Sequence, residues 1–110
     1  MYIRMAIHRP KPDMADLFLD SMRRFKAAQT GLPGLVNVFA LADEKKESLV
    51  GIAIWESKEH FERSIDVARE AIKDDPHDEW EDNPPEMFEL EEAKARRPRP
   101  HTPPRASRCS

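Results

Sequence analysis

The stretch LVGIAIWESKEHF (residues 49–61) contains the pattern that decides the fold. The part up to Trp55 is rich in aliphatic and aromatic residues that favour strands. Ser57 then offers a helix N-cap, because its hydroxyl can accept a hydrogen bond from a backbone N–H group of the first turn. Apolar side chains follow at spacings of four, three and four: Phe61, Ile65, Ala68 and Ile72. The stretch therefore predicts a strand over residues 49–56 that leads directly into an amphipathic helix.

The residues before this stretch predict a strand, a helix and a second strand. Residues 2–9 alternate between two faces, which is a strand signature. A run with apolar side chains at spacings of three and four follows, and it predicts a helix that Asp13 caps and Gly31 ends. Residues 35–42 are rich in β-formers, and we expect them to pair with residues 49–56 as an antiparallel hairpin.

The residues after the second helix complete the pattern. Asp74, Asp75 and Pro76 end that helix, an acidic loop follows, and residues 87–91 alternate as a last strand. The order of elements is typical of a ferredoxin-like α+β fold, βαββαβ, with an antiparallel four-stranded sheet and both helices on one face. We expect residues 1–93 to form one such domain.

Side-chain alternation sorts the expected strands into two faces. The aliphatic face is expected to pack under the helices and comprises Ile3, Met5, Ile7, Val36, Val38, Ala40, Val50, Ile52, Ile54, Phe88 and Leu90. The mixed face combines large apolar, small and polar side chains: Tyr2, Arg4, Ala6, His8, Leu35, Asn37, Phe39, Leu41, Leu49, Gly51, Ala53, Trp55, Met87 and Glu89.

The mixed face needs a cover. Leaving its large apolar side chains in water forgoes about 1.5–3 kcal/mol for each and creates an apolar patch that is unusual for a monomer. We therefore expect a homodimer, in which the same face of a second copy covers it. The small residues Gly51 and Ala53, beside Arg4, His8 and Asn37, predict an apolar pocket for a small-molecule ligand between the two sheets.

Composition disfavours several other classes of protein. The 110 residues are 39% hydrophobic and 35% charged, and the apolar runs are far shorter than the roughly 20 residues that a membrane helix needs. We find no signal peptide pattern. The single cysteine, Cys109, cannot form an intrachain disulfide. These features favour a cytoplasmic protein that does not insert into a membrane.

The net charge of −3 is divided unevenly along the chain. Residues 1–93 contain 21 acidic and 12 basic residues, whereas residues 94–110 contain 6 Lys and Arg and no acidic residue. The basic, proline-rich segment 94–110 cannot bury a core and is expected to be disordered. It has no aromatic residue to stack on bases and the remaining chain is acidic, which disfavours nucleic-acid binding.

The chain resembles the antibiotic biosynthesis monooxygenase-like members of the dimeric α/β barrel superfamily. The resemblance covers residues 2 to about 92. It rests on the order of elements, on Leu32-Pro33-Gly34 before the second strand, and on IWESKEHF (residues 54–61), which looks like that family's passage from the third strand to the second helix. It implies a dimeric barrel, and for some members it implies oxygenation of polyphenolic compounds without a cofactor.

Three polar residues of the expected pocket are candidate catalytic residues. A neutral imidazole at His8 could take a proton from a phenol before oxygen attacks, or His8 is a strand-end residue near solvent. Arg4 could stabilise a developing oxyanion, or it could pair with Glu89 across the sheet. Asn37 could orient a substrate oxygen, or it makes a structural hydrogen bond.

Other residues are candidates for substrate contacts. Trp55, Phe39 and Tyr2 are expected as pocket walls, with packing in the core or in the dimer as the alternative for Trp55. His60 could lie at the pocket mouth or simply in water on the first helical turn. The acidic run of residues 74–82 lacks a defined ligand spacing, so we expect a solvated loop and no metal site.

Two functions follow from these features. The first is a homodimeric, cofactor-independent monooxygenase that acts on a small aromatic or polyphenolic compound. The alternative is a noncatalytic homodimer that binds a small molecule or supports a partner. A haem-degrading enzyme is disfavoured, because such members of the family carry an Asn where this chain has His8, and a Trp near the position of Ser64.

Overall fold

The computed structural model describes residues 1–93, and the expected disorder of the basic segment concerns residues 94–110, which lie outside the described part. The elements follow the expected order, with one short helix added before the last strand. They are β1 (Tyr2–His8), α1 (Ala15–Gln29), β2 (Leu35–Ala42), β3 (Leu49–Trp55), α2 (Lys58–Arg69), α3 (His77–Trp80) and β4 (Glu86–Glu91).

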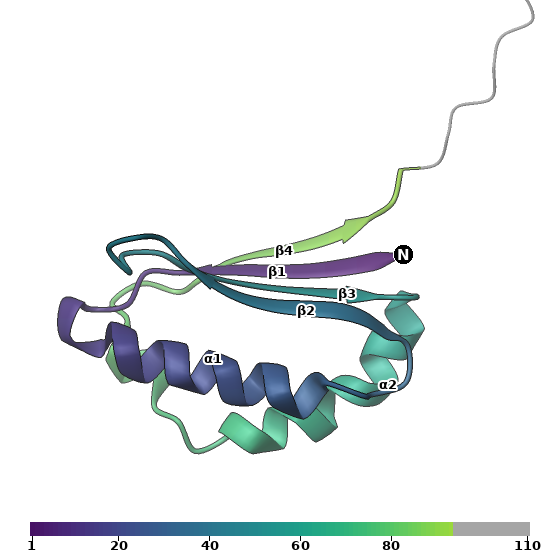
Figure 1. The fold of residues 1–110 in the computed structure, drawn as a ribbon, viewed down its shortest axis with the longest axis horizontal. Coiled ribbons are helices and arrows are strands. Elements are labelled where there is room, and N and C mark those ends of the chain that lie inside the picture. Colours follow the sequence, from purple (N-terminus) through teal and green to yellow (C-terminus); the bar gives the residue numbers. More distant parts are fainter. Residues whose placement is uncertain (94–110) are drawn as a thin grey trace, which may run out of the picture.

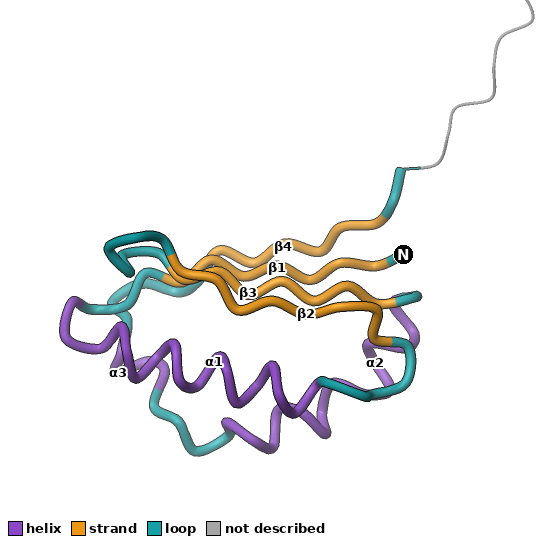
Figure 2. Tube along the Cα trace, in the orientation of Figure 1, coloured by secondary structure: helices purple, strands orange, loops and turns teal. Residues whose placement is uncertain are grey.

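The four strands form one antiparallel sheet in the order β2-β3-β1-β4. Figure 1 shows α1 and α2 on the same side of this sheet. The strands and helices therefore make two layers, as Figure 2 shows along the Cα trace. The expected α+β, ferredoxin-like fold with a four-stranded antiparallel sheet is confirmed.

The helix ends agree with the sequence at two of three points. Ser57 caps α2, because its hydroxyl accepts a hydrogen bond from the backbone N–H of His60 at 3.1 Å. Gly31, with a φ of 88°, follows the end of α1 as expected. Asp13 is not the cap of α1: it lies in a 3-10 turn, Pro12–Met14, and the helix begins after it without a side-chain cap.

The assignment of the two sheet faces was wrong for β1, β3 and β4, where Phe88 and Leu90 pair with Met5 and Ile3 on the open face. Tyr2, Leu49 and Trp55 are fully buried under the helices, whereas Ile52 and Ile54 alternate to the side that the helices leave open. The reason is that both faces are apolar. The β-branched residues resemble a core face, but the aromatic side chains at the strand ends, Tyr2 and Trp55, are the ones that pack under the helices.

Strand β2 differs from its neighbours because of an irregularity. Its pairing with β3 shifts between Leu35 and Asn37, so that Leu35 packs against the buried cluster under the helices. Beyond the shift, Val38 is buried as expected, and Phe39 lies on the open face as expected. The alternation along β2 was therefore correct except at Leu35 and at Val36, which is 55% exposed, because the added residue of the irregularity exchanges the faces of the residues before it.

Two groups of buried side chains hold the layers together. One surrounds Trp55, whose indole meets the Phe61 ring edge-on at 5.9 Å between centroids. The other lies toward the opposite end of β3 and contains Phe18, Leu19 and Leu49. Among residues 1–93, no helix has the length and apolar character needed to cross a bilayer.

Candidate functional site

A cavity of about 420 Å³ lies between the sheet and the helices. Small residues of β1, β2 and β3 form its floor: Ala6, Ala40, Gly51 and Ala53. Large apolar side chains of the helices form its walls, among them Phe18, Met22, Phe25, Phe61 and Ile65. Space is left because the floor has almost no side-chain volume: even a Cβ atom at Gly51 would only reach ordinary contact with Met22, at 3.5 Å.

One part of the cavity contains a histidine and a buried carboxylate in contact. His8 is the last residue of β1, and its Nδ1 lies 3.2 Å from Oε1 of Glu81. Glu81 is only 8% exposed, and it is held beside the end of β1 by a β-bridge to Pro10. With the proton on Nδ1, His8 donates to Glu81, and Nε2 becomes the ring nitrogen that can accept a proton.

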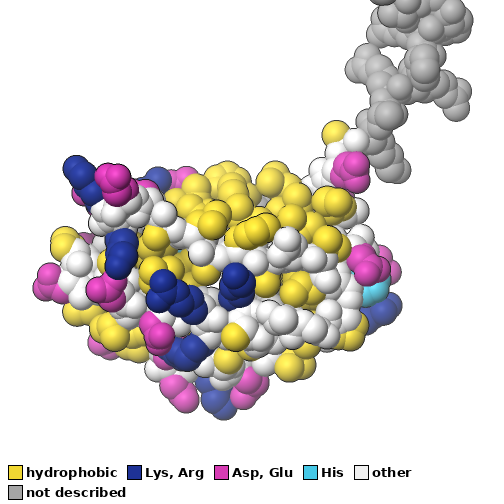
Figure 3. All heavy atoms as spheres, viewed as in Figure 1, with side chains coloured by type: hydrophobic (Ala, Val, Ile, Leu, Met, Phe, Trp, Pro, Cys, Tyr) yellow, Lys and Arg dark blue, Asp and Glu magenta, His cyan; other side chains and the backbone are white. Residues whose placement is uncertain are grey.

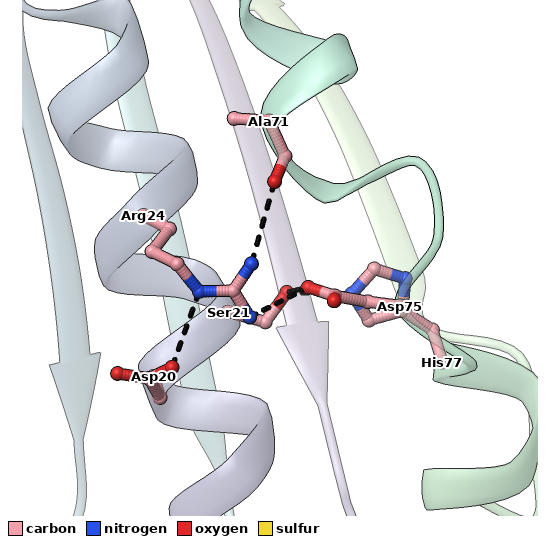
Figure 4. A network of polar contacts seen from close by, with 6 residues as sticks. All are labelled: Asp20, Ser21, Arg24, Ala71, Asp75 and His77. Atoms are coloured by element: carbon pink, nitrogen blue, oxygen red, sulfur yellow. Dashed lines mark hydrogen bonds and ion pairs between the residues drawn. The ribbon is translucent and has the colours of Figure 1, made fainter.

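A second polar group on the cavity wall comes from the start of α3 and the segment before it. His77 lines the cavity, and its Nε2 lies 2.8 Å from the hydroxyl of Ser21, which donates to Asp75 at 2.6 Å. Arg24 donates to the same carboxylate at 2.8 Å and to the carbonyl of Ala71 at 3.3 Å (Figure 4). Two residues of α1 therefore fasten the whole segment after α2.

The structure lowers the pKa of both titratable groups of this network, His77 and Asp75, for different reasons. Burial lowers the pKa of His77, although the negative charge of Asp75 opposes the shift. The hydrogen bond from Ser21 lowers the pKa of Asp75, and the Arg24 guanidinium acts in the same direction. The arrangement therefore favours a neutral imidazole at the cavity and a carboxylate toward the surface.

The guanidinium of Arg4 lies at another part of the cavity. It stacks over the ring of Phe61, at 4.7 Å from the centroid, and pairs with Glu89 at 3.5 Å. Tyr2 donates to the other oxygen of Glu89 at 2.7 Å, which lowers the pKa of that carboxyl group. Arg4 is thus partly neutralised, but it still contributes a positive charge to the cavity lining.

Comparison with known proteins identifies the fold. No family model and no curated protein matches the chain. Solved structures do match: PA3566 from Pseudomonas aeruginosa (TM-score 0.71, 14% identity, 84% of this chain and 94% of that one) and Rv0793 from Mycobacterium tuberculosis (0.70, 11%, 86% and 96%). A structure described as an antibiotic biosynthesis monooxygenase matches over 86% of this chain and all of its own (0.70, 13%). The chain has the antibiotic biosynthesis monooxygenase-like fold. At these identities the likeness concerns the fold alone.

Within this antibiotic biosynthesis monooxygenase-like fold, two of the three candidate catalytic residues share the cavity. Arg4 and His8 line it together with Gly51 and Ala53. The cavity lies under the helices of one subunit, however, and not on the open face of the sheet, so its expected location was wrong. Asn37 does not line it: the residue is exposed on the open face, and its Oδ1 accepts a hydrogen bond from the backbone N–H of Val38 at 2.8 Å.

The candidate substrate contacts divide in the same way. Trp55 and Tyr2 belong to the buried cluster and do not line the cavity. Phe39 borders the cavity, but its side chain alternates to the open face and is 37% exposed. His60 lies at the start of α2, where Nδ1 is 2.7 Å from the Ser57 hydroxyl, away from the main cavity.

Three residues of the site were missed from the sequence: Ser21, His77 and Glu81. The run of residues 74–82 was interpreted as a solvated loop, although Glu81 is buried and Asp75 is tied to α1. The available signal was Trp80 next to Glu81, because a tryptophan in an acidic run marks a segment that packs. Within residues 1–93, no three His, Cys, Asp or Glu side chains are placed to share a metal ion.

Proposed function

We propose that this protein is a cofactor-independent oxygenase of a small hydroxylated aromatic compound, bound between sheet and helices. The observation that carries the proposal is the contact of His8 with the buried Glu81 at an apolar cavity. A carboxylate that orients a histidine is the arrangement that makes the other ring nitrogen a general base. We also propose a cytoplasmic location, supported by the single cysteine of the sequence.

The proposed reaction needs only a base and dioxygen. Nε2 of His8 takes the proton of a ring hydroxyl, and the electron-rich phenolate carbon adds dioxygen. The resulting peroxide loses the hydrogen of that carbon and releases its outer oxygen, so that a phenol and O₂ give a quinone and water. The substrate supplies the electrons, and the proton on His8 leaves in the water. Arg4 is proposed to bind a polar group of the substrate at the other part of the cavity, where its guanidinium lies over Phe61.

Cavity size and lining support an aromatic substrate. A volume of about 420 Å³ lies in the range of small-molecule sites, which are mostly apolar with a few polar groups. The walls offer the rings of Phe18, Phe25 and Phe61, which favour flat aromatic ligands. The apolar lining also keeps water away from the oxygen-reactive carbanion.

Oxygen consumption with a panel of phenols and hydroquinones tests the proposal. We expect uptake with at least one member and a loss of about 100-fold or more in His8→Ala, since general bases contribute roughly that factor. His60→Ala is the matched control, because His60 lies away from the main cavity, and its rate should stay within about twofold.

Two results would contradict the oxygenase proposal. Uptake that is unchanged in His8→Ala removes this residue from the mechanism. Thermal stabilisation by an aromatic ligand without any oxygen uptake would instead establish the noncatalytic binding protein, the alternative that the same cavity supports.

We further propose that two copies pair through the open face of the sheet. This face carries exposed apolar side chains on both edge strands, including Phe39, Leu41, Phe88 and Leu90. Figure 3 shows hydrophobic side chains gathered on the sheet side of the molecule. A contiguous apolar surface of this kind marks an interface, and a second copy with the same surface is its natural partner. The sequence led us to expect that a second copy covers the mixed face, but the face left open is the one that carries the aliphatic residues, so the second copy is proposed to cover that face.

A further inference from the structure

The hydrogen bonds around Ser21 have a fixed direction. A carboxylate only accepts hydrogen bonds, and the lowered pKa of Asp75 keeps it ionised, so the single hydroxyl hydrogen of Ser21 points to Asp75 at 2.6 Å. Nε2 of His77 lies 2.8 Å from the same hydroxyl oxygen and therefore has to donate to it (Figure 4). A neutral imidazole carries one hydrogen, so Nδ1 of His77 is left as the acceptor nitrogen.

Nδ1 of His77 is free to meet a ligand. It makes no hydrogen bond with residues 1–93, and it keeps accessible surface, unlike Oε2 of Glu81. His77 lines the cavity, and burial lowers its pKa, which keeps the ring neutral at neutral pH. The cavity therefore contains, besides Nε2 of His8, a second imidazole nitrogen that can accept a proton.

The two imidazoles lie at the same end of the cavity. Both pack against the ring of Phe18, with centroids 4.6 Å away for His8 and 5.2 Å away for His77. Each is oriented by a carboxylate, in direct contact for His8 and through the Ser21 hydroxyl for His77. A substrate at this end of the cavity therefore has two proton acceptors beside it.

The proposed reaction removes two protons from the substrate. His8 takes the first one from a ring hydroxyl and delivers it to the outer oxygen of the peroxide. The second one leaves the carbon that has bound dioxygen. A general base acts only on a hydrogen within its reach, and the hydroxyl and the attacked carbon occupy different positions of the ring. A second base beside the ring serves the second position.

We propose that Nδ1 of His77 takes, as a proton, the hydrogen of the carbon that has bound dioxygen, and that Ser21 and Asp75 are positioning residues that keep this nitrogen unprotonated. The electron pair of the C–H bond forms the C=O bond of the quinone, and the O–O bond breaks. The outer oxygen, which already carries the proton from His8, leaves as hydroxide and takes the proton of His77 to become water. This step rests on the proposed oxygenase function.

Nitrogen NMR of the isotope-labelled natural chain tests the hydrogen-bond direction without any turnover, because protonated and unprotonated ring nitrogens resonate at different frequencies. At neutral pH we expect His77 to carry its hydrogen on Nε2. In Ser21→Ala the imidazole loses the partner that fixes its tautomer, so the two tautomers should mix. If this variant does not fold, as judged by circular dichroism, the tautomer of the natural chain decides alone.

Oxygen uptake with the phenol or hydroquinone that is turned over tests the proton step. We expect a loss of about 100-fold in His77→Phe, the contribution of a general base, and of about tenfold in Ser21→Ala, the effect of one hydrogen bond. Deuterium on the reacting carbon should slow His77→Phe more than the natural chain, because removal of that hydrogen becomes the slow step. Ser64→Ala is the matched control: Ser64 is buried on α2 but does not line the main cavity, and its rate should stay within about twofold.

The outcomes separate this inference from the oxygenase proposal. Uptake that needs His8 but is unchanged in a folded His77→Phe leaves the oxygenase and rejects the role of His77. A hydrogen on Nδ1 of His77 in the natural chain, or a single unchanged tautomer in a folded Ser21→Ala, rejects the positioning by Ser21 and Asp75 whether or not oxygen is consumed. No uptake with any phenol rejects the oxygenase and the proton step together.

Discussion

At the scale of single residues, the contact of Gly34 with His60 gives a structural reason for the histidine that was a candidate substrate contact. Gly34 has a φ of 84°, and a Cβ atom placed on it would collide with the Cβ and Cγ atoms of His60. The imidazole therefore packs directly on the glycine backbone, while the backbone N–H of His60 donates to the Ser57 hydroxyl. His60 joins the start of α2 to the turn before β2, which is a structural role.

Gly34→Ala should be strongly destabilising. The new methyl group combines a left-handed backbone with a collision against side-chain atoms that cannot move far, and we expect a loss of about 2–4 kcal/mol in the free energy of unfolding. Gly31→Ala is the matched control: its φ is 88°, but a Cβ atom meets nothing within 4 Å, so only the backbone strain of about 1–2 kcal/mol remains. Urea denaturation measures both, and equal losses would contradict the packing argument.

What the sequence could predict at this scale depends on the range of the contact. The pairing of Arg4 with Glu89 was foreseen as an alternative, because strand alternation places both on one face, and the structure shows it. The burial of Glu81 was not foreseen. It depends on a bridge to Pro10 across more than half of the chain, and a local pattern carries no information about such a contact.

At the scale of elements, the segment from the end of α2 to α3 is held on α1 by side chains and not by a continuous layer of strands. Ser21 and Arg24 contact Asp75, and Phe18 packs against His77 and Trp80, with centroids 5.2 and 5.9 Å from its own. This segment brings His77 and Glu81 to the cavity. Its attachment therefore determines whether the site is complete.

The lowered pKa of His77 makes this attachment sensitive to pH. The unfolded chain binds a proton at His77 below about pH 6.5, whereas the folded protein resists protonation to lower pH because the imidazole is buried. Stability is therefore full above pH 6.5 and decreases as the pH falls toward the lowered pKa. His77→Phe keeps an aromatic ring and removes the proton, so its stability should decrease less between pH 7 and pH 5.

Urea denaturation of both chains at several pH values checks this expectation. A decrease in His77→Phe equal to that of the natural chain would show that other groups cause it. Loss of the Ser21 contact in this variant lowers stability at every pH, so the slope against pH and not the absolute value is the decisive quantity.

The order of elements was predictable because each strand and helix has its own local period, and the caps and glycines that bound them are short-range signals. The face of each strand was harder to predict. Alternation correctly predicts that the side chains of Ile52 and Ala53 lie on opposite faces of the sheet. It does not say which of the two faces packs against the helices. The large aromatic side chains at the strand ends, Tyr2 and Trp55, were the better guide, because both are buried under the helices.

At the scale of the whole molecule, the sheet has an apolar layer on each side. Helices cover one side, and the other is open, with Val36, Leu41 and Leu90 each more than 40% exposed. A monomer of this kind leaves a surface in water that is usually buried, which is why we propose the homodimer. The proposal leaves the cavity complete within each copy.

A charge in the middle of the open face should prevent pairing. Ile52 lies on the second strand of the sheet and pairs with Met5 and Phe39, so Ile52→Glu places a carboxylate in the centre of the proposed interface. We expect light scattering at micromolar concentration to give a dimer for the natural chain and a monomer for the variant. Val67→Glu, on the exposed side of α2, should remain dimeric. A natural chain that is monomeric under these conditions rejects the proposal.

Neighbouring positions of β3 therefore report on different properties. Gly51 and Ala53 form the cavity floor, whereas Val50, Ile52 and Ile54 point to the open face. A substitution scan over residues 50–54 would alternate in its effect, with positions 51 and 53 changing ligand affinity and positions 50, 52 and 54 changing the association constant. Homologous sequences would be expected to vary these two sets independently, so that substrate preference can diverge while the mode of assembly is preserved.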